Sequence, residues 1–207
     1  MQNIRNIQNR AMIIAMTGAS GAAYGLRLMQ KLLKENIFLH VLLSDAACVV
    51  LKQECDLLLP EKAAGKSKML AEYLGVDATS LCCYEKHDWF SPAASGSSNI
   101  RQMVVVPCSM GTLAGIANGI SDHLIERAAD VMIKERKQLI LVPRETPLSA
   151  IHLEHMLKLS RLGVDMIPAM PGFYHRPKAI DELIDFMVDR ILDHLHVNNA
   201  EAKRWGE

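Results

Sequence analysis

The chain has 207 residues, of which 50% are hydrophobic and 22% are charged, a composition typical of a globular domain with a sizeable core. Lys and Arg together number 23, as do Asp and Glu, so no global positive field favours a nucleic-acid partner. The wholly apolar runs are far shorter than the roughly 20 residues of a membrane span, so the chain is not expected to cross a membrane.

The N-terminal residues and the cysteines both favour a protein that is not exported. Residues 1–10 are polar and rich in Asn and Gln, which predicts a disordered or frayed extension before a single domain of residues 11–207. The five cysteines are an odd number without metal-ligand spacing. This pattern favours reduced thiols, no metal site and a cytoplasmic location.

The first predicted element is an apolar strand over residues 11–16, followed by the turn Gly18-Ala19-Ser20-Gly21 and a helix over residues 23–34. This order points backbone N–H groups and the positive end of a helix dipole at one spot, with the Ser20 hydroxyl beside it. We therefore predict that a phosphate-bearing cofactor binds there. The alternative is that the glycines only let the chain reverse, because the third Gly of the dinucleotide fingerprint is missing.

Further apolar runs predict strands over residues 38–43, 103–107, 139–142 and 164–167. Four further helices are expected. One begins near Ser44, the second runs from Ser121 to about Lys137, the third runs from Ser149 to Leu162, and the fourth carries an apolar stripe from Ile180 to Ile191. This alternation predicts an α/β fold, a single-domain, three-layer, Rossmann-like (flavodoxin-like) doubly wound parallel sheet. The long segment 57–99 is expected to be a functional or mobile loop.

Polar residues follow most of the predicted strands, at the edge where such sheets bind ligands. They lie in residues 18–20, at Ser44, and in the segments 107–112, 143–146 and 168–176. Because these segments converge on one edge, the sequence predicts a polar, phosphate-binding site that contains an ionisable pair.

Four of the polar side chains on helices have two interpretations each. Ser109 and Thr112 could bind a phosphate or a ring edge, and the alternative is that Ser109 only caps a helix. Arg127 and Lys134 lie seven residues apart on one helix face, separated by about 10 Å of helix rise. This spacing suits either a phosphate site or a solvated charged face.

Arg144 and Glu145 follow the fourth predicted strand, where neighbouring side chains point to opposite sides. Arg144 is suited to bind a phosphate and Glu145 to move a proton, and the alternative is a local ion pair. Tyr174, in an aromatic loop after the fifth strand, could contact a ligand or pack against another subunit. Cys108 is not expected to be a nucleophile, because no His lies near it in the sequence.

Taken together, these residues resemble the UbiX-type flavin prenyltransferases, a branch of the wider flavoprotein group with phosphopantothenoylcysteine-decarboxylase-like folds. The matching motifs extend from about Ala11 to the C-terminus. They are Thr17-Gly18-Ala19-Ser20-Gly21-Ala22, Ser44-x-Ala46-Ala47, Ala94-Ser95-Gly96-Ser97, Pro107-Cys108-Ser109-Met110, Leu124-x-x-Arg127 with Lys134-Glu135-Arg136, Pro143-Arg144-Glu145-Thr146-Pro147, Pro168-Ala169-x-Pro171-x-Phe173-Tyr174 and Arg204-Trp205.

The resemblance implies a reaction in which dimethylallyl monophosphate donates its five-carbon unit to N5 and C6 of reduced FMN, without a metal. The prenylated FMN would serve UbiD-type decarboxylases, for instance in ubiquinone biosynthesis. The chain would assemble as a homododecamer in the cytoplasm. FMN is then a substrate that must be released, rather than a permanently bound cofactor.

The resemblance also implies a role for each matched residue. FMN would be bound by Gly18, Ala19, Ser20, Ser44, Ser109, Met110, Thr112 and Arg127. The dimethylallyl phosphate would be held by Lys134, Arg144, Tyr174, Arg190 and Trp205. Ser20, Glu54 and Glu145 would be the catalytic residues that manage protons, with Glu145 or the departing phosphate as the base for the C6 proton. Gly111 stands where some relatives carry Lys.

Two other functions are compatible with the same fold. Flavin-dependent oxidative decarboxylases of cysteine-like thiols carry a Pro-Ala-Ser-Ala-Asn-Thr-type motif whose Asn anchors the substrate carboxylate, but residues 107–112 contain no Asn here. The second is a non-catalytic FMN carrier or regulatory subunit, which would need no second phosphate site. The presence of Lys134, Arg144 and Arg190 argues against this function, because these cations are suited to bind a second phosphate.

Overall fold

The computed structural model of the chain describes residues 10–198. Six parallel strands form one sheet in the order β3-β2-β1-β4-β5-β6. The strands are β1 (Ala11–Met16), β2 (Phe38–Leu43), β3 (Leu81–Cys83), β4 (Gln102–Cys108), β5 (Gln138–Pro143) and β6 (Asp165–Met166). The expected N-terminal extension, except for Arg10, and the tail that carries Trp205 lie outside the described residues.

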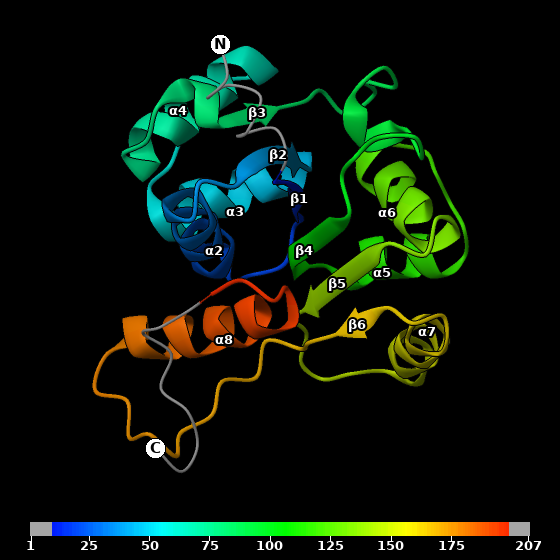
Figure 1. Cartoon of the computed structure of the whole chain (residues 1–207). Coiled ribbons are helices and arrows are strands. Elements are labelled where there is room, and N and C mark those ends of the chain that lie inside the picture. Colours follow the sequence, from blue (N-terminus) through cyan, green and yellow to red (C-terminus); the bar gives the residue numbers. More distant parts are fainter. Residues whose placement is uncertain (1–9, 199–207) are drawn as a thin grey trace.

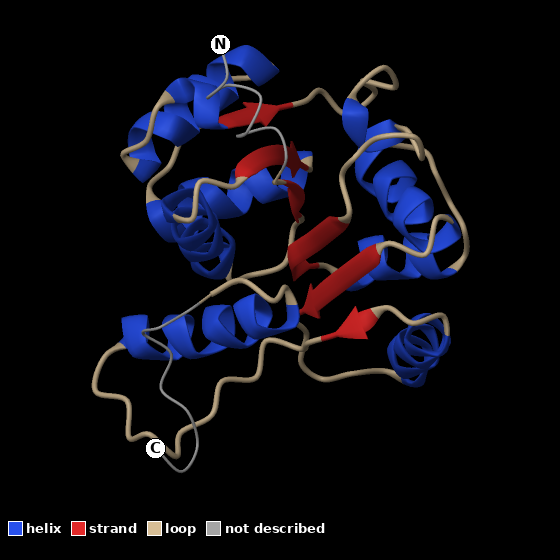
Figure 2. Cartoon of the chain, viewed as in Figure 1, coloured by secondary structure: helices blue, strands red, loops and turns tan. Residues whose placement is uncertain are grey.

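Helices cover both faces of this sheet, as Figures 1 and 2 show. One face packs against α2 (Ala22–Lys34), α3 (Asp45–Cys55), α4 (Ala63–Leu74) and α8 (Ile180–His194). The other packs against α5 (Met110–Ala117), α6 (Leu124–Lys134) and α7 (Ala150–Arg161). Two short 3₁₀ helices, η1 (Ala78–Ser80) and η2 (Pro92–Ala94), flank β3 in the chain. The predicted three-layer, doubly wound α/β fold is therefore confirmed.

The alternation of side chains along β1 explains why its sequence is apolar throughout. Met12, Ile14 and Met16 face the core under α2, whereas Ile13 and Ala15 face the core under α5 and α6. A strand buried on both faces needs apolar residues at every position, since successive side chains point to opposite sides. This rule made most of the strands predictable.

The strand order reverses between β1 and β4. The chain runs from β1 outward through β2 to β3, and then returns to place β4 on the other side of β1. In open parallel sheets, the carboxyl ends of the strands at such a point form the usual ligand-binding crevice. The loops after β1 and β4 therefore lie side by side where the candidate residues were predicted.

Two predictions about the elements were wrong. The segment 57–99 is not one loop, because it contains α4, β3 and both 3₁₀ helices. Ser121 does not cap α6, which begins at Leu124 with His123 as its N-cap. The Asp122 N–H instead donates to the carboxylate of Glu126 at 3.0 Å. This bond holds the turn before Leu124 in a conformation that is not part of the helix. Ser149 and Gly163 do mark the ends of α7 as predicted.

A row of ion pairs fixes α8 against α2. Arg27 pairs with Asp181 and Asp185 at 3.0 and 3.5 Å, and Lys31 pairs with Asp185 at 3.1 Å and with Asp189. The half-buried position of Lys31 lowers its pKa, but the carboxylate partners outweigh this and raise the pKa overall. The helix that carries Arg190 is thereby set on the α2 face of the sheet.

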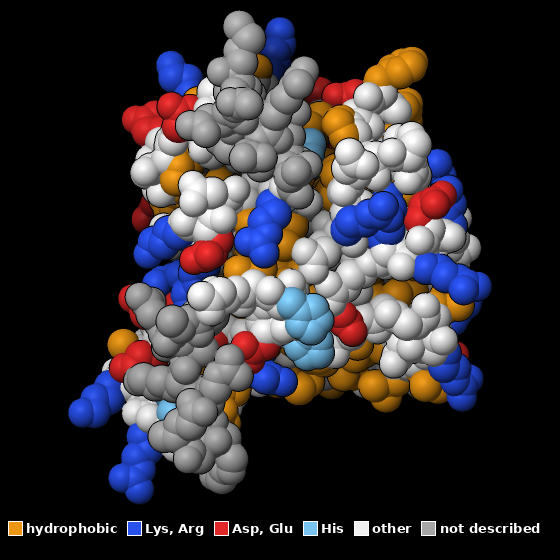
Figure 3. All heavy atoms as spheres, viewed as in Figure 1, with side chains coloured by type: hydrophobic (Ala, Val, Ile, Leu, Met, Phe, Trp, Pro, Cys, Tyr) orange, Lys and Arg blue, Asp and Glu red, His pale blue; other side chains and the backbone are white. Residues whose placement is uncertain are grey.

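The distribution of surface charge and the length of the helices relate to the expected absence of nucleic-acid and membrane partners. On the face in Figure 3, Lys and Arg side chains are scattered among acidic and uncharged groups rather than gathered into one stripe. Within residues 10–198, no helix has both the length and the apolar character to cross a bilayer.

Buried His40 on β2 leads to a prediction about stability. Its Nδ1 lies 2.7 Å from the Tyr84 hydroxyl, and burial lowers its pKa to about 4. Because the unfolded chain binds this proton more readily, stability should fall as the pH drops from about 7 to about 5, by about 1–2 kcal/mol from this group. Urea unfolding should show that His40→Gln reduces this loss, whereas His196→Gln on the surface leaves it unchanged. Equal losses in all three proteins would contradict the assignment.

Candidate functional site

Two loops at the carboxyl ends of β1 and β4 are joined directly. The backbone N–H and the hydroxyl of Thr17 both donate to the carbonyl oxygen of Pro107, at 3.1 and 3.0 Å. The Ser109 N–H in turn donates to the Thr17 hydroxyl oxygen at 2.7 Å. The predicted flavin residues that follow β1 and those that follow β4 are thus brought together.

The loop after β2 meets the same place. A Cβ added to Gly18 would lie 2.5 Å from the Cβ of Ala46, so only glycine allows the two loops this approach. Ser44 caps α3 by accepting the Ala47 N–H at 3.0 Å. Gly18, Ser44 and Ser109 therefore lie on three loops that meet at the carboxyl edge of the sheet.

The N-terminus of α2 carries an unexpected partner. Both the Gly21 and Ala22 N–H groups donate to the carboxylate of Glu54, at 2.9 Å each. Burial alone raises the pKa of Glu54, but bonds from the Ser20 hydroxyl and these two N–H groups, with Arg144 nearby, lower it overall. In the structure this carboxylate accepts two of the N–H donors at the helix end where a phosphate was predicted, so a phosphate at that end would share these donors with Glu54 or replace it.

Replacing Glu54 with Gln tests this contact through stability. Loss of the charge at the N-terminus of α2 should lower the free energy of unfolding by about 0.5–1 kcal/mol at neutral pH. Since the folded pKa lies below its ordinary value, the contribution is present above that ordinary value and disappears as the pH falls through the folded pKa. The two proteins should therefore converge in stability once the pH falls below the lowered pKa of the Glu54 carboxyl. Glu72→Gln on α4 is the control, and a Glu54→Gln protein as stable as the parent at neutral pH would contradict the role.

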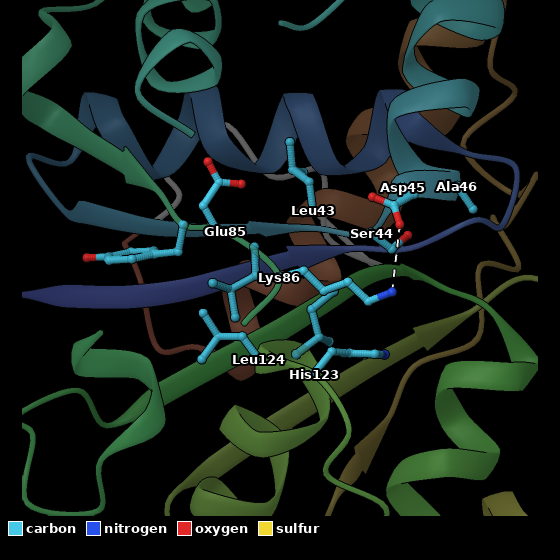
Figure 4. A pocket seen from close by; sticks show the side chains of 11 residues that line it. Leu43, Ser44, Asp45, Ala46, Glu85, Lys86, His123 and Leu124 are labelled. Carbon is cyan, nitrogen blue, oxygen red and sulfur yellow. Dashed lines mark ion pairs between the residues drawn. The ribbon is translucent and has the colours of Figure 1, made fainter. Parts of the chain in front are cut away.

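A cavity of about 270 Å³ opens beside Ser44. It is lined by the end of β2 and start of α3 (42–46), the segment after β3 (84–86) and the start of α6 (123–125). Figure 4 shows the Lys86 and Asp45 side chains facing each other across it, in an ion pair of 3.7 Å. Its lining combines apolar side chains of β2 and α6 with polar and charged ones such as Ser44, Tyr84 and Glu85, so it offers both packing surface and hydrogen-bonding groups to a small molecule.

Tyr84, Lys86 and His123 line this cavity and were missed in the sequence. Tyr84 and Lys86 follow β3, a strand too short to be recognised from its apolar residues. His123 lies just before α6, whose start was placed too early. With these two boundaries correct, the rule that ligands bind at the carboxyl ends of strands would have indicated Tyr84 and Lys86.

Ser109 caps α5 and its hydroxyl is fully engaged. Its oxygen accepts the Thr112 N–H at 3.3 Å, and its hydroxyl donates to the Thr112 hydroxyl oxygen at 3.1 Å. The cap interpretation is therefore confirmed, while Thr112 and Ser109 remain half-buried and next to Thr17. Met110 begins the helix as a buried residue of the core under α5 and α6. Gly111 is exposed, and a Cβ there would meet nothing within 4 Å, so the longer Lys of some relatives would fit.

Arg127 and Lys134 lie on α6 beside the loop that follows η2. Arg127 donates to the Ala94 carbonyl at 3.2 Å and pairs with Asp130 at 2.8 Å. Lys134 pairs with Glu135, and its ammonium lies 3.0 Å from the position of a Cβ on Gly96. Arg127 thus contacts the end of η2 and Lys134 approaches the loop after it, and each cation is paired with a carboxylate on or next to α6.

Arg144 and Glu145 face different partners, as the extended backbone predicted. Arg144 is exposed and close enough to Tyr24 and Glu54 to lower the pKa of each through its charge, although burial raises the pKa of Tyr24 overall. Glu145 accepts the Thr146 N–H at 3.0 Å. Ser20, Glu54 and Arg144 therefore form one polar cluster, and Glu145 lies next to it in the chain.

Tyr174 and Arg190 belong to the α2 face of the sheet. The Tyr174 ring packs edge-on against Phe186 of α8, with ring centroids 5.6 Å apart. Arg190 on the same helix pairs with Asp193 at 3.2 Å. Arg127 and Lys134 lie on α6, which covers the opposite face, so one copy of the chain separates the two pairs (Figure 1).

The thiols of the site region are not activated. Cys108 is completely buried, and burial raises its pKa to about 12. All five cysteines are free, and the described residues contain no group of His, Cys, Asp or Glu that could hold a metal ion. This agrees with the expectation that Cys108 is not a nucleophile.

The comparisons with known proteins are consistent with this geometry. The model of the family described as Flavoprotein matches residues 1–192. The flavin prenyltransferase UbiX of Pseudomonas aeruginosa is 51% identical over 194 residues, which cover 94% of this chain and 93% of that protein. The chain belongs to the UbiX-type branch of the Flavoprotein family.

Solved UbiX structures share the fold over nearly the whole chain. AnUbiX in complex with FMN and dimethylallyl pyrophosphate has a TM-score of 0.85 at 39% identity, covering 96% of this chain and 98% of that chain. A dodecameric FMN-dependent UbiX-like decarboxylase from Escherichia coli O157:H7 has a TM-score of 0.83 at 41% identity, covering 95% and 100%.

The residues of this UbiX-type chain fit a flavin mononucleotide. The cavity beside Ser44 offers apolar side chains on which a ring could pack, and the loop after β4 carries Thr112, whose hydroxyl accepts from Ser109 and can still donate. Arg127 supplies a guanidinium suited to a phosphate. The exposed, unobstructed backbone at Gly111 leaves room beside these groups.

Proposed function

We propose that the chain transfers a dimethylallyl group from dimethylallyl monophosphate to N5 and C6 of reduced FMN. The observation that carries the proposal is the cluster of Ser20, Glu54 and Arg144 beside the loops expected to bind FMN. Storage of a flavin needs no such set of a hydroxyl, a carboxylate and a guanidinium. Transfer of an allylic group from a phosphate needs both a cation for the leaving group and residues that move protons.

FMN is proposed to bind through Gly18, Ala19, Ser20, Ser44, Ser109, Met110, Thr112 and Arg127. The direct contacts of the loops after β1, β2 and β4 support this set. When bound, FMN supplies the nucleophilic N5 and C6 atoms of its ring system. The reduced state of the flavin is part of the proposal, because N5 is nucleophilic only in that state.

The dimethylallyl phosphate is proposed to lie against Lys134, Arg144, Tyr174 and Arg190, with Trp205 closing the site. Lys134 lies on α6 on one face of the sheet, whereas Tyr174 and Arg190 lie with α8 on the other, which supports a site completed by more than one copy of the chain. The dodecameric assembly of the UbiX-like protein from Escherichia coli supports a homododecamer here. Cations of the protein would stabilise the departing phosphate without a metal.

Glu54 and Glu145 are proposed to have different roles in proton transfer. With its lowered pKa, Glu54 is an acceptor at neutral pH and orients the Ser20 hydroxyl. Glu145 is half-buried and its carboxylate is held by one backbone N–H, which leaves its second oxygen available. Glu145 or the released phosphate would take the C6 proton, so that one donor gives one phosphate and a flavin enlarged by C5H8.

The alternatives receive less support. The solved structures of phosphopantothenoylcysteine decarboxylase mutants are only 18–19% identical to this chain, so they support a shared fold and not a shared activity. The substrate-anchoring Asn of such decarboxylases has no counterpart among residues 107–112. A cytoplasmic location and delivery of the product to a UbiD-type decarboxylase complete the proposal, and the free thiols support the location.

The experiment separates these functions by their products. Anaerobic protein is incubated with reduced FMN and either dimethylallyl monophosphate or dimethylallyl diphosphate, with EDTA present throughout, and released phosphate and flavin products are separated by chromatography. A new flavin formed with the monophosphate in step with phosphate release supports the proposal. Release of CO2 from a cysteinyl substrate, with unchanged FMN, would favour the decarboxylase, and turnover only with the diphosphate would overturn the donor.

A further inference from the structure

Thr17 is the only threonine buried in the core among the described residues, at 1% exposure, and it lies between β1 and the Gly18-Ala19-Ser20-Gly21 turn. A buried hydroxyl is costly unless it is satisfied by hydrogen bonds. The Thr17 hydroxyl donates to the Pro107 carbonyl and accepts the Ser109 N–H, partners that lie 90 and 92 residues away in the chain. The Thr17 hydroxyl therefore acts as both donor and acceptor, and it joins the end of β1 to the end of β4.

We propose that Thr17 is a positioning residue that sets Ser109 and Thr112 against the turn after β1, an inference that rests on the proposed flavin-binding role of those residues. Successive hydrogen bonds link Thr17 to Ser109 and Ser109 to Thr112. The Thr17 hydroxyl fixes the backbone of Ser109, and the Ser109 hydroxyl then fixes both the N–H and the hydroxyl of Thr112. The chain of bonds runs from the end of β1 into the first turn of α5.

The neighbouring residue extends the connection to the third loop. Gly18 lies against Ala46, close enough that a methyl group on Gly18 would overlap the Ala46 side chain. Ala46 follows Ser44 in the first turn of α3. Thr17 and Gly18 together therefore set the spacing of all three loops, one by hydrogen bonds and the other by close packing.

Thr17→Val isolates the hydroxyl, because Val replaces the oxygen with a methyl group of similar size. The Ser109 N–H would lose its acceptor in a buried place. The methyl group would also need a separation of about 3.5–4.0 Å where the hydrogen bond now spans 2.7 Å, so Ser109 would be displaced. A shift of this size at a binding group should weaken the binding of FMN about 10–100-fold.

The test compares FMN affinity, by flavin fluorescence without a prenyl donor, across a series at this position. Thr17→Ser keeps the oxygen and should bind FMN within about threefold of the parent. Thr17→Ala removes the acceptor without adding a clash and should weaken binding about tenfold. Val104→Ala, in the middle of β4 and fully buried, is the control for a general loss of stability. Thermal unfolding and circular dichroism of each variant report the fold.

The expected result is weak FMN binding by Thr17→Val and Thr17→Ala, rescue by Thr17→Ser, and near-normal affinity of Val104→Ala. If Thr17→Val does not fold, the comparison of Thr17→Ala with Thr17→Ser decides the question. Normal FMN affinity in the Ala variant, or equal weakening by Val104→Ala, would overturn the positioning role. Since no prenyl donor is present, a chain that binds FMN in this pattern but never prenylates it would refute the proposed function and leave this inference intact.

Discussion

Arg144→Met is expected to slow dimethylallyl transfer by about 10²–10³-fold while leaving the affinity for FMN nearly unchanged. The guanidinium follows β5 and acts on Glu54 and Tyr24, so it lies in the polar cluster rather than with the flavin loops. Its charge would stabilise the phosphate as the allylic C–O bond breaks. Met keeps most of the length of the side chain and removes only the charge and the donors.

The measurement is the rate of product formation in a single turnover, with FMN prebound and saturating donor. Arg161→Met, at the exposed end of α7, is the matched control and should react like the parent. Removing Arg144 also removes one of the influences that lower the pKa of Glu54, so that pKa should rise in the variant. Parent-like turnover, or a loss of FMN binding equal to the loss of rate, would contradict the assignment of Arg144 to the donor.

Glu145→Gln is expected to leave FMN bound and to reduce formation of the final product by about 10²–10⁴-fold, the usual range for loss of a general base. Glutamine keeps the size of the side chain and can still accept the Thr146 N–H with its amide oxygen. It cannot take up the C6 proton. Fluorescence titration of FMN and chromatography of the quenched reaction measure the two effects separately.

A purely structural role of Glu145 predicts something different. If the carboxylate acts as a base, Glu145→Asp should recover part of the rate that Glu145→Gln loses, whereas a purely structural role predicts no such recovery. Glu154→Gln on α7 controls for a change in net charge. An unchanged rate in Glu145→Gln would assign the C6 proton to the released phosphate instead.

Most of the sheet was predictable because its strands are buried on both faces. The apolar runs at 11–16, 38–43, 103–107 and 139–142 all became strands within one residue or two of their predicted ends. β3 was missed because three residues, two of them cysteines, give no periodic signal. α6 begins three residues after Ser121 because the Glu126 carboxylate, and not a serine hydroxyl, accepts from the preceding turn.

The candidate site was predictable where it depends on strand order, and not where it depends on helix placement. Residues after β1, β2 and β4 meet because parallel strands end at one edge, which the sequence pattern predicts. The contact of Glu54 with Gly21 and Ala22 joins positions about 33 residues apart and depends on how α3 returns along the sheet. The hydrogen bonds of buried Thr17 could not be predicted either, since its partners lie at the end of β4, 90 and 92 residues later in the chain.

The mass of the flavin recovered after reaction shows whether this chain is a prenyltransferase. Protein, reduced FMN and dimethylallyl monophosphate are incubated without oxygen, the protein is removed, and the flavin is analysed by mass spectrometry beside a reaction with Arg144→Met. The parent protein should yield a flavin heavier by one C5H8 unit, and the variant should leave FMN mostly unmodified. Unmodified FMN after prolonged incubation with the parent protein, under conditions where it binds FMN, would rule out the prenyl transfer.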